Sequence, residues 1–370
     1  MVRFMTASSR ALEVYDLKLT VVTPFFVGDG IELDKRSYLY NQSKKTVSMI
    51  DPERLFKLIV DSRLTDAYEA FMLGGGKDLY EFLRYNRVPE QAINELILYS
   101  VDAENAIVID KYGKPKPQNI HTFIRDAYGN PYVPGSSVKG ALRTIILQKL
   151  ILGDRNRPDM DTNDKHFSTD FDKALSSRYI NTLKLHKEQT NPLNSIMRGI
   201  RISDSKPLSN SDLTLSKKID VHTDGSDKDI PVVRETLKPQ SELQFKLTLD
   251  QGLLKNQITP EYIIDAANQY VDYYYDTYIM KFKKADDEAD INYNDCLIFG
   301  GGSGFFTKSL LYPYFGEERA LKITAELMKR NYKNGKHYLD QKQGISPRTL
   351  KYTKFRQKLL PLGVCKIEIK

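Results

Sequence analysis

One segment of the chain strongly predicts a buried helix. From Ser137 to about Ile151 the apolar residues recur at helical spacing, at Val138, Ala141, Leu142, Ile145, Ile146 and Leu150. Pro134 and Gly135 come directly before this run and predict an extended entry followed by a tight turn. Ser136 and Ser137 are residues of the type that caps helices. The segment therefore predicts a capped core helix that begins directly after a turn.

Two cations lie near the start of this predicted helix. Lys139 and Arg143 are four residues apart, so they share one helix face. Positive charge in the first turns opposes the helix dipole, which costs about 0.3–1 kcal/mol per charge. A bound phosphate removes this cost, because a helix start also offers free N–H groups. Two interpretations stay open at this point: an anion-binding helix start, or a core helix with two solvated cations.

A second segment, Phe299 to Ser309, is rich in glycine. Four glycines fall within five positions, and two aromatic residues and a lysine follow: Gly300, Gly301, Gly302, Gly304, Phe305, Phe306 and Lys308. Glycine lets a backbone approach a ligand closely or adopt positive φ, and aromatic rings beside a cation suit stacked bases and phosphates. The spacing matches neither the dinucleotide fingerprint nor the P-loop. The segment is either a nucleic-acid-binding loop or a flexible surface loop.

A third segment, Lys342 to Lys358, is basic throughout. It holds six cations and no acidic residue, with Tyr352 and Phe355 interleaved. Such a run usually forms a solvated face, and the interleaved aromatic residues favour RNA or DNA as a partner.

Composition limits the class of protein. The formal net charge is +7, from 55 Lys and Arg against 48 Asp and Glu, and this modest excess does not by itself establish nucleic-acid binding. The two cysteines and five scattered histidines predict neither a disulfide framework nor a metal site, and no cofactor is expected. No apolar stretch has the length of a signal peptide or a membrane span, which predicts a soluble, cytoplasmic protein.

The remaining elements predict an α+β architecture, because strands alternate with helices without a regular βαβ repeat. Strands are expected at 17–23, 200–203, 242–249 and 364–369, and helices at 259–284 and 317–330. A helical insertion is expected at 51–101, with Asp51 and Pro52 at its start, Gly74–Gly76 inside it and a second helix at 89–99. Loops are expected at 111–120, where the chain is basic, at 152–176, and at 204–229.

Together these segments resemble the RAMP superfamily of CRISPR-associated RNA-binding proteins. The first strand runs into Gly28-Asp29-Gly30, as the family's first strand runs into a small glycine turn. Val133 to Arg143 looks like the family's helix-opening motif, and Gly300 to Gly304 with Phe305 and Lys308 looks like its glycine-rich loop. Arg234-Glu235 and Pro347 to Leu350 also fit, so the resemblance extends from about residue 16 to the C-terminus.

The resemblance implies a fold and a function. Two RRM-like (ferredoxin-like) domains are implied, an N-terminal one at 1–205 carrying the insertion and a C-terminal one at 206–370 carrying the glycine-rich loop 300–304. Within the family, the chain looks most like the capping subunit of type III-A (Csm) effector complexes. Such a subunit binds the 3′ part of the crRNA, docks on the backbone RAMP subunit and contacts other Csm subunits. It also supports crRNA maturation through host nucleases and is not an enzyme itself.

The resemblance also implies which residues contact RNA. Those in the helix-opening motif are Gly135, Ser136, Ser137, Lys139 and Arg143, and those in the loop are Gly300, Gly301, Gly302, Gly304, Phe305 and Lys308. Arg234 and Arg348 are further candidates for phosphate contacts. The alternative is a RAMP endoribonuclease that cuts crRNA precursor or target RNA, because Asp29 and Asp34 occupy the loop in which the related backbone subunit carries its catalytic aspartate. We expect both to be turn and surface residues.

Overall fold

The fold is described from a computed structural model of the chain. The structure describes residues 12–74, 78–104, 106–109, 115–116, 118–162, 167–283, 291–332, 335 and 337–370. Gly75 and Gly76 of the expected insertion, and residues 111–114 and 117 of the expected basic linker at 111–120, lie outside the described residues.

The first sheet has five antiparallel strands. Its order is β13 (Cys296–Ile298), β16 (Val364–Ile369), β1 (Leu12–Val21), β12 (Glu242–Asp250) and β9 (Ile200–Ile202). The central pair runs in register from Leu12 opposite Asp250 to Thr20 opposite Glu242. Alternate residues of β1 are fully buried at its C-terminal end, as the period of two in the sequence predicts. The four strands expected from the sequence are present, although β1 begins earlier and ends before Thr23.

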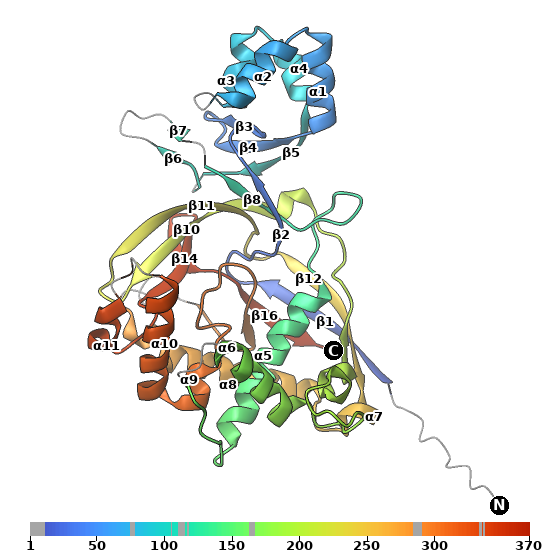
Figure 1. The fold of residues 1–370 in the computed structure, drawn as a ribbon. Helices are drawn as coiled ribbons and strands as arrows, with labels where there is room; N and C mark the ends of the chain where they lie inside the picture. The colour runs from blue at the N-terminus through green and yellow to red at the C-terminus, as the bar shows by residue number, and fades with distance from the viewer. Residues whose placement is uncertain are drawn as a thin grey trace, which may run out of the picture.

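Two long helices pack on each other beside this sheet (Figure 1). The helix α5 (Gly135–Gly153) contains the predicted apolar stripe, whose residues are buried except for the half-buried Leu150. The helix α8 (Pro260–Thr277) begins at Thr259, whose hydroxyl accepts a hydrogen bond from the Tyr262 N–H at 3.2 Å. It ends before the predicted residue 284, and a 3₁₀ turn at Ile279–Lys281 follows it.

The second sheet has nine strands. Its main path is β2 (Gly28–Leu33), β8 (Ile120–Phe123), β11 (Asp227–Leu237), β10 (Leu213–His222), β5 (Ile97–Asp102), β4 (Thr46–Ile50) and β3 (Tyr38–Asn41). The strand β14 (Thr349–Phe355) pairs with β10 and with β15 (Lys358–Pro361). A short ribbon, β6 (Val108–Ile109) with β7 (Pro115–Lys116), stands apart from both sheets.

One apolar core joins the two sheets. Leu19 and Val21 of the first sheet belong to the same buried cluster as Leu215 and Val233 of the second. The α+β fold of RRM-like units with helical insertions is confirmed. The domain boundary at residue 205 stays a prediction, because both sheets draw strands from either side of it.

Two of the expected loops are wrong. The region 204–229 contains β10 and the start of β11, which form a long antiparallel hairpin. Leu213, Leu215, Ile219 and Val221 are buried in β10, so an apolar alternation was present among the polar residues. The region 152–176 contains α6 (Phe167–Leu175), which buries Phe167, Phe171 and Leu175 at intervals of four residues. A π-helical turn, Ser176–Ile180, continues it.

The helical insertion has an apolar cluster of its own. Its helices are α1 (Pro52–Asp61), α2 (Thr65–Leu73), α3 (Leu79–Tyr85) and α4 (Glu90–Glu95), which lie together at one end of the molecule (Figure 1). Leu55, Ile59, Phe82 and Ile93 are among the residues buried in this cluster. Asp51 caps α1, as predicted, by accepting hydrogen bonds from the N–H groups of the first turn. The helix expected at 89–99 ends at Glu95, because the chain from Ile97 pairs with β4 as β5.

Four more helices lie in the described C-terminal part of the chain, besides α8. These are α9 (Leu311–Phe315), the predicted α10 (Glu317–Asn331) and α11 (Asp340–Gln343), and a short helix α7 (Gln251–Leu254) follows β12. Among the described residues, no helix combines the length and apolarity that crossing a bilayer requires.

Candidate nucleic-acid interface

The helix start and the glycine-rich loop, far apart in sequence, line one pocket. The pocket has a volume of about 430 Å³. The helix α5 contributes Ser137, Gly140, Ala141 and Thr144, and the loop contributes Gly300, Gly301, Thr307 and Lys308. The two segments therefore lie at one open surface.

The first turn of α5 is fixed by its own chain. The Gly135 N–H donates a hydrogen bond to Asp204 Oδ1 at 2.9 Å. A Cβ atom at Gly135 would lie 2.3 Å from the carbonyl oxygens of Ile202 and Ser203, so only glycine allows the helix to pack this closely on the end of β9. Ser136 and Ser137 lie inside the helix, and its N-cap residue is Pro134, whose side chain makes no capping hydrogen bond. The expected serine caps are wrong, and Ser136 is exposed to solvent.

The two cations of α5 differ in their partners. Arg143 donates hydrogen bonds to Asp172 Oδ1 and Ser176 Oγ, both at 2.9 Å, so a neighbouring helix neutralises its charge. Lys139 is half-buried and forms no ion pair with any described residue. Burial of the Lys139 ammonium, followed by repulsion from Arg201, lowers its pKa. Lys139 is therefore the cation of this pair that lacks a counter-ion.

The glycines let the loop approach the chain that follows β1. Gly300 has φ +91°, and a Cβ atom there would lie 2.6 Å from the carbonyl oxygen of Phe26. The Gly301 N–H donates a hydrogen bond to that same oxygen at 2.7 Å. Gly302 and Gly304 also have positive φ values. The glycines are thus explained first by packing within the protein, and their contacts with RNA stay a prediction.

The loop is braced internally rather than free. The Ser303 hydroxyl bonds the Gly300 carbonyl oxygen at 3.0 Å and lies 2.9 Å from the Thr307 hydroxyl. Phe306 is buried and stacks on Tyr278 with ring centroids 4.1 Å apart. Phe305 is only partly buried. These contacts favour a preformed binding loop over the flexible surface loop.

A second pocket of about 350 Å³ continues the open surface along α5. It shares Thr144 and Lys308 with the first pocket, and Arg143, Gly304 and Phe305 also line it. Sequence reasoning missed Thr144. Its four-residue spacing from Gly140 on the helix was the available signal.

Arg234 reaches the same loop from β11. Its guanidinium lies 5.5 Å from the ring centroid of Phe26, and its Cζ atom would be 3.5 Å from a Cβ atom at Gly302. Burial lowers the pKa of Arg234, and its Nη1 atom is inaccessible to water and has no hydrogen-bond partner among the described residues. Burial and repulsion from Arg234 also lower the pKa of Lys308.

The basic segment 342–358 is divided between three places. Lys351 packs against Gly304, since a Cβ atom at Gly304 would lie 3.3 Å from the Cγ atom of Lys351. Arg348 instead donates a hydrogen bond to the buried Asp340 at 2.6 Å. A phosphate contact by Arg348 stays a prediction.

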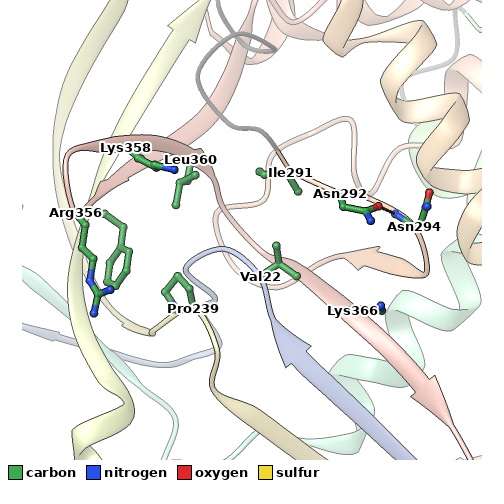
Figure 2. Close-up of a pocket in the computed structure, with 10 residues that line it drawn as sticks. Val22, Pro239, Ile291, Asn292, Asn294, Arg356, Lys358, Leu360 and Lys366 are labelled. Atoms are coloured by element: carbon green, nitrogen blue, oxygen red, sulfur yellow. Dashed lines mark hydrogen bonds between the residues drawn. The ribbon is translucent and has the colours of Figure 1, made fainter.

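Arg356 and Lys358 line a separate pocket of about 530 Å³, together with Lys366 and the amides of Asn292 and Asn294 (Figure 2). The sequence directly before Ile291 is acidic, from Asp286 to Asp290, and lies outside the described residues. The cations alone therefore do not define a ligand for this pocket.

Asp29 and Asp34 hold turns. Asp29 Oδ1 accepts hydrogen bonds from the Ile31 N–H at 2.8 Å and the Thr122 hydroxyl at 2.7 Å. Asp34 forms an ion pair with Arg36. Burial opposes ionisation of Asp34, but the hydrogen bonds from Arg36 outweigh it and lower the pKa of Asp34. Within the described part of the chain, no three His, Cys, Asp or Glu side chains are grouped so that they could hold a metal ion.

The two sheets, the buried helix and the glycine-rich loop define an α+β protein built on ferredoxin-like units. Residues 18–369 match the family model of the RAMP superfamily, and the chain belongs to this superfamily.

Relatives of known identity share most of its length. The CRISPR system Cms protein Csm5 of Streptococcus thermophilus is 26% identical, and the match covers 85% of this chain and 86% of that protein. The Csm5 proteins of Enterococcus italicus and Mycobacterium tuberculosis are 23% and 24% identical, and the matches cover 87% and 97% of this chain and 87% and 98% of those proteins.

Solved structures share the fold. A chain in the cryo-EM structure of a Csm–crRNA–target RNA ternary complex, from a type III-A CRISPR-Cas system, matches with a TM-score of 0.62 and 19% identity. That match covers 96% of this chain and 100% of the other. The crystal structure of T. onnurineus Csm5 matches with a TM-score of 0.63 and 17% identity, over 94% of this chain and 99% of that one.

Proposed function

We propose that this chain is an RNA-binding subunit of a type III-A CRISPR (Csm) effector complex, in which it binds the 3′ part of the crRNA. Membership of the RAMP superfamily supports this proposal, as do full-length relatives named Csm5. A protein with the same fold is present in a Csm complex with crRNA and target RNA. The other Csm subunits are accordingly its partners.

The observation that carries the proposal is the shared pocket between α5 and the glycine-rich loop. Lys308 lines this pocket. Lys139, two residues after Ser137 on α5, does not line it but has no counter-ion among the described residues. Placing a half-buried cation such as Lys139 without a carboxylate costs free energy, and a polyanion that neutralises it recovers that cost. Because phosphate contacts position a strand without reading its bases, the subunit accepts many guide sequences.

The finer role we propose is that of a cap. The subunit ends the filament by docking on the last backbone RAMP subunit, and it supports crRNA maturation by recruiting host nucleases. It acts without catalysis of its own. The turn contacts of Asp29 and the ion pair of Asp34 support this, since a carboxylate already engaged in structure is poorly placed to act on a scissile phosphate.

Crosslinking to RNA in the assembled complex tests the RNA-binding role. The chain is produced with the other Csm subunits and a crRNA, irradiated, and examined for a crosslink to the 3′ part of the crRNA. The double variant Lys139→Ala with Lys308→Ala should lose most of that crosslink. The control Lys57→Ala with Lys329→Ala removes equal charge from exposed lysines that have no ion pair among the described residues, and should retain it. A crosslink of equal yield in both variants would refute the site.

The purified chain with labelled RNA and magnesium tests the absence of catalysis. We expect no specific cuts. Cuts that appear with the wild-type chain and disappear in Asp34→Ala would establish the endoribonuclease instead.

A further inference from the structure

Three cations lie around one carboxylate, Asp220, and a fourth cation, beside the glycine-rich loop, lies close to one of the three. They are Lys218 of β10, Arg234 of β11, Lys308 after the loop and Lys351 of β14. The strands β11, β10 and β14 are neighbours in the second sheet (Figure 1). We call these residues, with Asp220, the four-cation cluster.

The contacts of the four-cation cluster leave most of its charge unbalanced. Asp220 Oδ1 lies 2.9 Å from Lys351 Nζ and 3.9 Å from Lys218 Nζ. Only 24%, 21% and 17% of the side-chain surfaces of Lys218, Lys351 and Asp220 are exposed to solvent. Four cations against one carboxylate leave an excess of three positive charges. Lys308 is exposed, but Lys218 is held with little solvent and is repelled by both Lys351 and Arg234, and a bound anion would offset this repulsion.

Two independent features point to a ligand. The buried Nη1 atom of Arg234 has no hydrogen-bond partner among the described residues, although buried guanidinium groups normally satisfy their donors. Between Lys217 and Lys218 the pairing of β10 with β11 shifts, since Lys217 is opposite Val233 and Lys218 is opposite Ile230. Such a bulge re-aims the side chains of a strand and is common beside functional sites.

We propose that the four-cation cluster binds one phosphate group of the bound RNA. This inference rests on the proposed function and extends it, because Lys218 and Lys351 lie outside the two sequence motifs. A guanidinium and several ammonium groups match a phosphate, which offers several acceptor oxygens and a full negative charge. The phosphate is either a phosphodiester within the strand or a monoester at its 3′ end. A carboxylate of a partner protein is the competing occupant.

The variant Lys218→Gln tests the cluster with the full-length chain and a labelled single-stranded RNA oligonucleotide. Lys218 is a better choice for substitution than Lys351, because replacing Lys218 leaves the ion pair of Lys351 with Asp220 intact. We expect the affinity to fall about tenfold, the loss typical of one charge-assisted hydrogen bond. The salt slope of log affinity should fall by about 0.7, the value for one phosphate of a single strand. The control Lys57→Gln removes an exposed charge far along the chain and should change neither quantity.

The stability of Lys218→Gln gives a second readout. Repulsion from Lys351 acts on Lys218 in the free protein, and Arg234 adds to it. Removing this charge should therefore leave the melting temperature unchanged or raised while RNA affinity falls. Lys218→Arg retains the charge and should restore most of the affinity.

Two oligonucleotides distinguish the source of the phosphate. If the wild-type chain binds a 3′-phosphate oligonucleotide more tightly than its 3′-hydroxyl form, and Lys218→Gln removes the difference, the ligand is the terminal monoester. If the wild type binds both equally and Lys218→Gln weakens both, the ligand is an internal phosphodiester. Affinity and salt slope equal to those of Lys57→Gln would overturn the inference, and loss of Csm subunits from the complex without loss of RNA would assign the cluster to a protein partner. Failure of the wild-type chain to bind RNA would instead refute the proposed function.

Discussion

The hydroxyl of Tyr99 donates a hydrogen bond to Oε1 of Glu235 at 2.8 Å, and this joins the strand that leaves the helical insertion to the middle of the second sheet. Glu235 is fully buried, and its Oε2 accepts the Phe123 N–H at 2.9 Å. The guanidinium of Arg125 lies 3.6 Å from Glu235 and 4.1 Å from the ring centroid of Tyr99. One carboxylate thus ties together three strands, β5, β8 and β11.

Glu235→Gln should destabilise the chain by about 2 kcal/mol at neutral pH, because Arg125 loses its counter-ion and one of two hydrogen bonds loses its acceptor. Urea unfolding measures the difference. Tyr128→Phe, which removes an exposed hydroxyl, is the control and should have almost no effect. A Glu235→Gln chain as stable as the wild type would contradict the structural role.

The difference in stability between the wild-type chain and Glu235→Gln should depend on pH. Burial raises the pKa of Glu235 above its ordinary value of 4.5, although Arg125, the Phe123 N–H and Tyr99 oppose the shift. The native state therefore binds this proton more tightly than the unfolded state, so wild-type stability rises as pH falls through the raised pKa toward 4.5. Glutamine does not titrate. The deficit of Glu235→Gln should grow over this window, and a deficit independent of pH would be evidence against a raised pKa.

Lys139 and Arg143 should differ in their effect on RNA binding. Lys139→Ala removes an unneutralised charge and should lower the salt slope of log affinity by about 0.7. Arg143→Ala removes a charge that Asp172 already balances, so its effect should be smaller. Fluorescence anisotropy at several salt concentrations separates the two, with Lys57→Ala as the control. If both variants lowered the salt slope equally, RNA would have to displace Asp172 from its ion pair with Arg143.

Gly300→Ala should destabilise the chain more than Gly129→Ala. Both glycines have positive φ, +91° and +83°, so both substitutions incur backbone strain of about 1 kcal/mol. Gly129 has open space around it, whereas a Cβ atom at Gly300 would collide with the carbonyl oxygen of Phe26. We expect an additional cost of about 2 kcal/mol at Gly300. Equal melting temperatures of the two variants would contradict the close approach.

As pH rises, RNA affinity should begin to decrease at a lower pH than the usual pKa of a lysine would predict. The pKa of Lys308 lies below 10.5 in the free protein, and a phosphate beside the ammonium raises it again. A group whose pKa rises on binding favours the complex below its free pKa, and this gain is lost as pH increases through that value. Lys308→Arg keeps its charge throughout and should retain affinity over the same range. Parallel pH profiles for both chains would exclude Lys308 from the contact.

The sequence was sufficient to predict the elements with strong periodicity. The apolar stripe of α5, the start of α8 at Thr259-Pro260 and the strand β12 all depend on local patterns that tertiary packing left unchanged. The hairpin of β10 and β11 was missed, because the lysine, serine and aspartate residues between its apolar positions hid a buried alternation. The helix at 89–99 was too long, because pairing of β5 with β4 overrode its helical pattern.

The candidate site was only partly predictable for a related reason. The helix start and the glycine-rich loop carry local signals, and the resemblance placed both at the RNA. Whether a cation is free or paired depends on residues far along the chain. Asp172 neutralises Arg143 and Asp340 pairs with Arg348, whereas Lys139 has no such partner among the described residues. Lys218 was overlooked because the region around it was read as a loop.

The separate apolar cluster of the helical insertion has an evolutionary consequence. Residues such as Leu55, Ile59 and Phe82 pack among themselves, so they can be exchanged together without disturbing the contact between the two sheets. The helical insertion can therefore accumulate substitutions that adapt it to a different protein partner, while the proposed RNA-binding surface stays unchanged.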